Sequence, residues 1–114
     1  MKRDSKVFLL HIKESIDLIK SYTKDLSYSD FSESIQIQDS IIRRLEIIGE
    51  AIKNLPIDFK DKYSNIPWKA IAGMRDILTH QYFGIDFDLI WEVIQSDLPV
   101  LETNIRNILC ELDE

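Results

Sequence analysis

Arg75, Asp76, Thr79 and His80 are the residues whose types and spacing are best suited to chemistry in this sequence. On a helix they share one half of the circumference, at about 100° per residue. The planar guanidinium of arginine matches the oxygens of a phosphate group. The imidazole of His80, in the last turn of a helix, is expected to titrate near neutral pH and to accept a proton from an RNA 2′-hydroxyl. This grouping favours attack at phosphorus without a metal ion.

The neighbours of this group are unusual for a merely wet surface. Ala72 and Gly73 lie on the same half of the helix and leave room for another backbone or a flat ligand. Trp68 and Tyr82 stand seven residues before and after Arg75, so we expect both aromatic rings along nearly the same line. The alternative is a solvent-facing surface in which Asp76 and His80 form a weak i,i+4 pair.

A helix from Pro67 to about Tyr82 must carry these residues. Asn65-Ile66-Pro67 is a helix start signal, and Gly84 is well placed to end the helix. The expected core stripe of this helix comprises Ala70, Ile71, Met74, Ile77 and Leu78.

Apolar residues at spacings of three, four and seven predict further helices on both sides. The first runs from Ser5 to about Tyr22, capped by Asp4 or Ser5, and the second runs without interruption from Ser29 or Asp30 to Leu55. Residues 56–66 are expected to be irregular, with one short turn around 58–63. A helix capped by Asp86 runs to Leu98, and Pro99 either kinks it or begins a new helix that continues to Leu112. The fold class is therefore all-α: one domain over residues 1–114, an antiparallel bundle of four to five helices.

Composition agrees with an ordinary globular domain. The 114 residues are 45% hydrophobic and 30% charged, with only three Gly and three Pro. No apolar run approaches the ~18 residues that span a bilayer, and the N-terminus lacks a signal-peptide pattern, so we expect a cytoplasmic protein without a membrane partner. The single Cys110 and the two histidines, His11 and His80, leave no convincing metal site, and we expect no cofactor.

Four other groups have simpler interpretations than chemistry. His11 is interpreted as a partly buried structural histidine, Cys110 as a core or interface thiol, Trp91 as a core residue, and Glu46 and Glu50 as surface charges.

Charge is unevenly distributed along the chain. The formal net charge is -6, which argues against a general nucleic-acid coat. Residues 43–75 nevertheless hold seven bases and four acids, whereas residues 76–114 hold one base and nine acids. The basic residues of the middle segment predict a modest local surface for a short stretch of phosphates or a basic-surface partner: Arg43, Arg44, Lys53, Lys60, Lys62, Lys69 and Arg75. Among these, Lys69, Arg43 and Arg44 are the candidate RNA-binding residues.

The segment Arg75-Asp76-Ile77-Leu78-Thr79-His80-Gln81-Tyr82 resembles the R-x4-H-x-Y motif of HepT-like proteins, a branch of the HEPN superfamily. The second-helix segment around Gly49 (residues 41–51) and the flanks of the motif (residues 66–75 and 82–86) are also similar to that family. The similarity covers about residues 35–105.

This resemblance implies a function. HepT-like proteins are toxins of two-gene toxin–antitoxin modules and act as metal-independent ribonucleases. By that resemblance Arg75 and His80 are the catalytic pair, Asp76 and Thr79 support them, and two motifs meet across the cleft of a homodimer. The family's partner is a nucleotidyltransferase antitoxin, which attaches AMP to the motif tyrosine, here Tyr82.

Two other functions stay open at this point. One is a non-catalytic dimeric module that docks a nucleotidyltransferase, which the acidic net charge favours slightly. The other is a structural bundle whose polar face is only wet.

Overall fold

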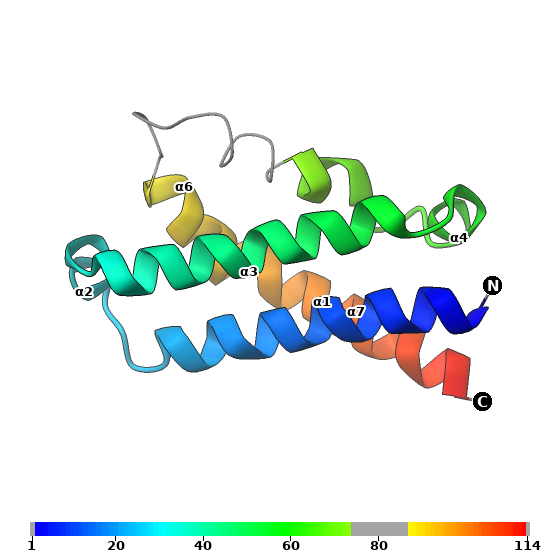
Figure 1. Cartoon of the computed structure of the whole chain (residues 1–114), viewed down its shortest axis with the longest axis horizontal. Helices are drawn as coiled ribbons and strands as arrows, with labels where there is room; N and C mark the ends of the chain where they lie inside the picture. The colour runs from blue at the N-terminus through cyan, green and yellow to red at the C-terminus, as the bar shows by residue number, and fades with distance from the viewer. Residues whose placement is uncertain (1, 74–86, 114) are drawn as a thin grey trace.

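The computed structural model describes residues 2–73 and 87–113, and helices dominate both ranges. Figure 1 shows three long helices, α1 (Lys2–Thr23), α3 (Ile35–Asn54) and α7 (Leu98–Asp113). Shorter elements join them: α2 (Tyr28–Glu33), α4 (Ile57–Lys62), a helical stretch over residues 68–73, α6 (Phe87–Glu92) and the π-helical turn η1 (Val93–Asp97). No strand occurs in these two ranges, which confirms the predicted all-α class.

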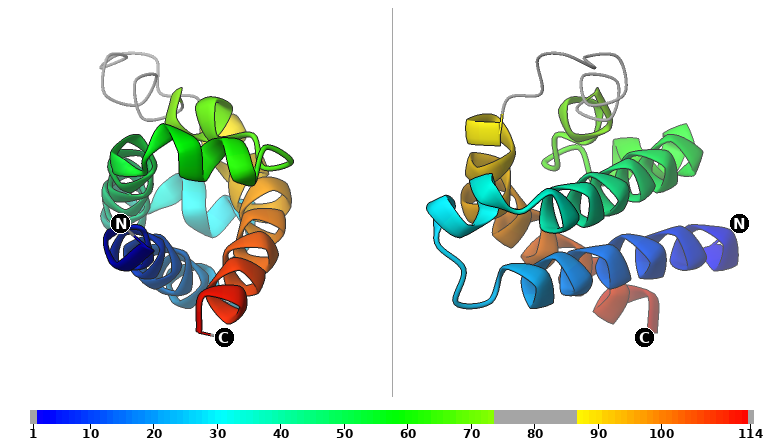
Figure 2. Two further views of the ribbon diagram at one scale, coloured as in Figure 1. Left: turned by 90° about the vertical axis from the view of Figure 1, so that its right-hand side faces the viewer. Right: turned by 60° about the vertical axis from the view of Figure 1, so that its left-hand side comes forward.

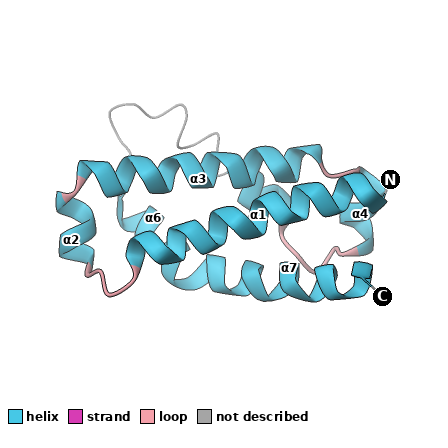
Figure 3. Cartoon of the chain, turned by 60° about the horizontal axis from the view of Figure 1, so that its bottom comes forward, coloured by secondary structure: helices cyan, strands magenta, loops and turns pink. Residues whose placement is uncertain are grey.

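α1 and α3 lie side by side and run antiparallel, and α7 packs along α1 (Figures 1 and 3). The end-on view of Figure 2 shows the helices arranged around a common interior. Salt bridges from Lys6 to Asp113 (2.5 Å) and from Lys20 to Glu102 (3.0 Å) join α1 to α7.

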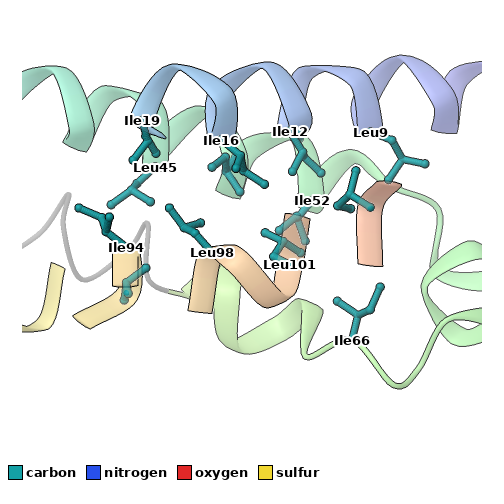
Figure 4. Packing of buried hydrophobic residues seen from close by; sticks show 14 of the residues in the cluster. Leu9, Ile12, Ile16, Ile19, Leu45, Ile52, Ile66, Ile94, Leu98 and Leu101 are labelled. Carbon is teal, nitrogen blue, oxygen red and sulfur yellow. The ribbon is translucent and has the colours of Figure 1, made fainter. Parts of the chain in front are cut away.

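The interior is aliphatic. Leu9, Ile12, Ile16 and Ile19 of α1 repeat at helical spacing, and each is at most 1% exposed. Figure 4 shows these side chains directed toward residues of α3, η1, α7 and the segment before residue 68. Burial of this stripe is what forces α1 into one orientation, because the charged residues of the helix must face water.

α1 begins earlier than predicted. The helix already includes Lys2, and Ser5 is an interior helical residue that is only 2% exposed. Asp4 or Ser5 as the N-cap was therefore wrong.

The predicted helix from residue 29 to Leu55 is divided at Ser34. The Ser34 hydroxyl accepts from the Ile37 amide (3.2 Å) and caps α3, while α2 ends just before it. The cap of α2 is Ser27, in a capping box with Asp30, and not Ser29 or Asp30 itself. Periodicity alone missed the break because Phe31 and Ile35 keep helical spacing across it; Phe31 is fully buried, whereas Ile35 is 73% exposed.

The C-terminal helices are continuous through a π-helical turn. The Leu98 amide donates to the carbonyl oxygen of Val93, one residue further back than in an α-helix. Pro99 has no amide hydrogen to donate, and a wider turn immediately before it accommodates the missing α-helical bond. α7 then continues to Asp113, so the kink at Pro99 was predicted and its π-helical form was not. Within the described ranges, no helix is both long enough and apolar enough to cross a bilayer.

Candidate functional site

The five motif residues Arg75, Asp76, Thr79, His80 and Tyr82 lie outside the described residues. The structure describes both edges of the motif, which are residues 67–73 on the N-terminal side and α6 on the C-terminal side. These edges determine where the chain enters and leaves the motif.

The N-terminal edge is a helix start anchored by Trp68. The Ile71 amide donates to the Pro67 carbonyl oxygen (3.1 Å), which confirms the predicted start at Pro67. The Trp68 indole donates to the Tyr63 carbonyl oxygen (3.1 Å), and the ring is only 6% exposed. Trp68 therefore belongs to the core, and its predicted place on the polar face with Arg75 was wrong.

The small residues of this edge face outward or lie half-buried. Ala70, predicted in the core stripe, is exposed, whereas Ile71 and Ala72 are half-buried against the core. Burial of Trp68 explains the error, because it turns residues 69 and 70 to the outside. A Cβ added at Gly73 would meet nothing within 4 Å, so the glycine does not serve a close contact with another described part of this chain.

An aromatic cluster fixes the C-terminal edge. Phe31 of α2 contacts Trp91 (centroids 5.3 Å apart) and Phe87 (5.9 Å) of α6. The Tyr28 hydroxyl donates to the Asp88 carboxylate, and its ring meets Trp91 edge-on at 5.9 Å. Trp91, predicted in the core, is half-buried at the edge of it. These contacts hold the first turn of α6 against α2.

A cavity of about 690 Å³ lies beside the N-terminal edge. It is lined by the C-terminal end of α3, by α4 and by residues 64–72, with three lysines and one aspartate in its walls: Lys53, Lys60, Lys69 and Asp61. Lys69, a candidate RNA-binding residue, is thus exposed at the wall of a real hollow.

The other two candidate RNA-binding residues are placed differently. Arg43 lines a separate groove of about 260 Å³ with Glu46, Ile47 and Glu50, so two carboxylates share its walls. Arg44 is half-buried. The structure therefore separates the arginines of α3 from Lys69 and groups Lys53 with it. Their net charge could be read from the sequence, but not which of them share a cavity.

No group of three or more potential metal ligands occurs among the described residues. His11 and Cys110 are both exposed, so the predictions of a partly buried histidine and of a core thiol were wrong. Each belongs to the outward face of its own helix, where it meets solvent instead of the aliphatic interior. The interpretation of Cys110 as an interface thiol stays a prediction.

The model of a protein family described as "Ribonuclease HepT-like" matches residues 12–108. A relative from Methanocaldococcus jannaschii named "Gamma-glutamylcyclotransferase and putative RNase" is 55% identical over 114 residues; the match covers all of this chain and 51% of that protein, so the chain spans about half of its length. A "putative RNase" of the same organism is 43% identical over 99% of this chain and 97% of its own. A "probable ribonuclease HepT" of Thermococcus cleftensis is 45% identical over 90% of this chain and 93% of its own. No solved structure gave a significant match.

Proposed function

The chain belongs to the ribonuclease HepT-like family, and from that premise we propose that it is a metal-independent endoribonuclease. The observation that carries the proposal is the family match over residues 12–108, a range that contains the whole Arg75–Tyr82 motif. Relatives named as RNases match this chain over nearly their whole length, which supports the same activity.

Arg75 and His80 are the proposed catalytic pair. The neutral imidazole of His80 takes the proton of an RNA 2′-hydroxyl, and the 2′-oxygen attacks the adjacent phosphorus. The bond from phosphorus to the 5′-oxygen of the next nucleotide breaks, and that oxygen leaves with a proton. Arg75 stabilises the negative charge that builds up on the phosphate oxygens. Asp76 and Thr79 hold the pair in position, and the first product is a 2′,3′-cyclic phosphate.

The proposed active cleft forms between two copies of the chain. Ala72 and the unobstructed Gly73 support this arrangement, because space beside small side chains is available to a second subunit. The proposed partner is a nucleotidyltransferase antitoxin. Its addition of AMP to Tyr82 would place a bulky, negatively charged group beside Arg75 and block RNA phosphate.

Substitution of the catalytic pair tests the activity. We expect Arg75→Ala and His80→Ala each to abolish RNA cleavage, measured with purified protein in the presence of a chelator, while circular dichroism shows unchanged helix content. RNA that lacks the 2′-hydroxyl at the cleaved nucleotide should resist. Undiminished cleavage by both variants, or equal cutting of the deoxy-substituted RNA, contradicts the mechanism.

A non-catalytic module that docks a nucleotidyltransferase is the second candidate, which the net charge of -6 favours. The purified wild-type protein discriminates the two. Stoichiometric binding of the nucleotidyltransferase without cleavage of any RNA would select the docking module.

A further inference from the structure

The cavity between the end of α3, α4 and residues 64–72 has the size of a small-ligand site. Its volume of about 690 Å³ falls in the range typical of ligand pockets, ~300–1,000 Å³. It is formed entirely by described residues that lie outside the Arg75–Tyr82 motif.

Two of the three lysines in its walls are available for a ligand. Lys60 is half-buried, and its amine donates to the Ile52 carbonyl oxygen (3.3 Å), so it caps the C-terminal end of α3. Lys53 and Lys69 are exposed, and no hydrogen bond or ion pair joins either amine to another described residue. The single acid in the wall, Asp61, leaves the cavity with an excess of positive charge in a protein whose net charge is -6.

The rest of the lining is apolar. Ile57, at the start of α4, is 76% exposed, although it lies in the wall of the cavity. Ile66 and Trp68 are 3% and 6% exposed and form part of a rigid base below it. Two amines beside an apolar surface suit a ligand that is anionic at one end and flat and apolar at the other.

We propose that this cavity binds one nucleotide of the RNA strand. The amines of Lys53 and Lys69 hold its phosphate, and the side chain of Ile57 packs against its base. The identification of RNA as the ligand rests on the proposed ribonuclease function. A lysine–phosphate contact carries no sequence preference, so the cavity strengthens binding and sets the register of the strand without reading its sequence.

The test uses an uncleavable probe, a fluorescent 2′-O-methyl RNA of about ten nucleotides. Fluorescence anisotropy measures its affinity for the full chain at several salt concentrations. We expect the double variant Lys53→Ala/Lys69→Ala to bind about tenfold more weakly at low salt. The slope of log affinity against log salt should fall by about 1.4, since each lost contact to a single strand contributes about 0.7. Lys53→Arg/Lys69→Arg should retain the affinity.

The matched control is Lys13→Ala/Lys24→Ala, which makes the same change in net charge on the far side of the sequence; Lys13 pairs with Asp17 (2.9 Å). It should bind the probe within about twofold of the wild type. Ile57→Ser should weaken binding without changing the salt slope, because it removes an apolar contact and no charge. Equal losses in the two double variants, unchanged affinity in Lys53→Ala/Lys69→Ala, or a wild type that does not bind the probe would each overturn the proposal.

Failure of the subsite and failure of the proposed function give different results. A wild type that binds the probe through Lys53 and Lys69 but cuts no RNA would end the ribonuclease proposal and leave the subsite standing. A chain that cuts RNA, with probe affinity unaffected by Lys53→Ala/Lys69→Ala, would end the subsite alone.

Discussion

Trp68 shows at the scale of one residue how packing decides the way a helix is presented. Its indole bond to the Tyr63 carbonyl and its near-complete burial fix the rotation of the helix that leads to Arg75. Because residue 68 faces the interior, the amine of Lys69 and the methyl group of Ala70 face outward into neighbouring hollows. One buried aromatic ring thereby determines which side chains a ligand meets.

Ser15 is the residue whose chemistry fits its surroundings least well. It is 1% exposed, and its hydroxyl has no hydrogen-bond partner among the described residues. We expect Ser15→Ala to raise the free energy of unfolding by about 0.5–1 kcal/mol, because it removes an unsatisfied buried group and adds a better helix former. Urea denaturation measures this as a higher midpoint with an unchanged slope.

Ser40→Ala is the matched control for that change. The Ser40 hydroxyl donates to the Gln36 carbonyl oxygen (2.8 Å), so its removal gains helix propensity and loses a bond. Its gain should be smaller than that of Ser15→Ala. A Ser15→Ala protein that is less stable than Ser40→Ala would show that the Ser15 hydroxyl does have a partner.

At the scale of elements, the junction of α2 and α3 holds the two halves of the predicted second helix at an angle. Gln38 is 7% exposed, and its side-chain amide donates to the carbonyl oxygens of Phe31 (3.0 Å) and Ser32 (2.9 Å). These are the last carbonyl groups of α2, which a continuous helix would have satisfied through its own backbone. The junction also positions Phe31 against α6, and so connects the break at Ser34 to the C-terminal edge of the motif.

Gln38→Leu should lower the free energy of unfolding by about 2 kcal/mol, since it keeps the bulk of the side chain and leaves two helix-end carbonyls without their donor. Chemical denaturation followed by circular dichroism measures the loss. Gln36→Leu, at an exposed position two residues earlier, is the control and should change stability by less than about 0.5 kcal/mol. Equal effects of the two substitutions would argue against the capping role of Gln38.

At the scale of the whole molecule, the acidic C-terminal part and the basic middle segment have to coexist on one small surface. Residues 76–114 carry nine acids and one base, so attraction of RNA to the molecule as a whole is weak. The basic cavity beside residues 67–73 concentrates positive charge where the proposed active cleft needs it. Two copies that share one cleft would bring two such cavities to one RNA strand and increase its affinity.

The shared cleft predicts that activity depends on protein concentration. If each cleft needs two copies, specific cleavage activity per chain should fall as the protein is diluted below the dissociation constant of the dimer. Sedimentation velocity and cleavage assays over the same dilution series measure the two midpoints, which should coincide. Full specific activity in samples that sediment as monomers would contradict the composite cleft.

The sequence by itself determined the all-α class, the approximate extent of α1, the short helix within residues 57–62 and the helix start at Pro67. Periodic aliphatic residues and proline act locally, so their effect can be read from spacing. The same local signals identified the family, through residues of the motif whose structure lies outside the described ranges.

Only the tertiary structure decided the division at Ser34, the burial of Trp68 and the partnership of Lys53 with Lys69. In each case the deciding contact joins groups that local spacing does not relate: the Gln38 amide to carbonyls of another helix, the Trp68 indole to the turn before it, and α3 to residues 64–72 across a cavity. Hydrophobic periodicity shows that a residue faces the interior, but the free energy of each hydrogen bond and each shared hollow depends on which element stands opposite.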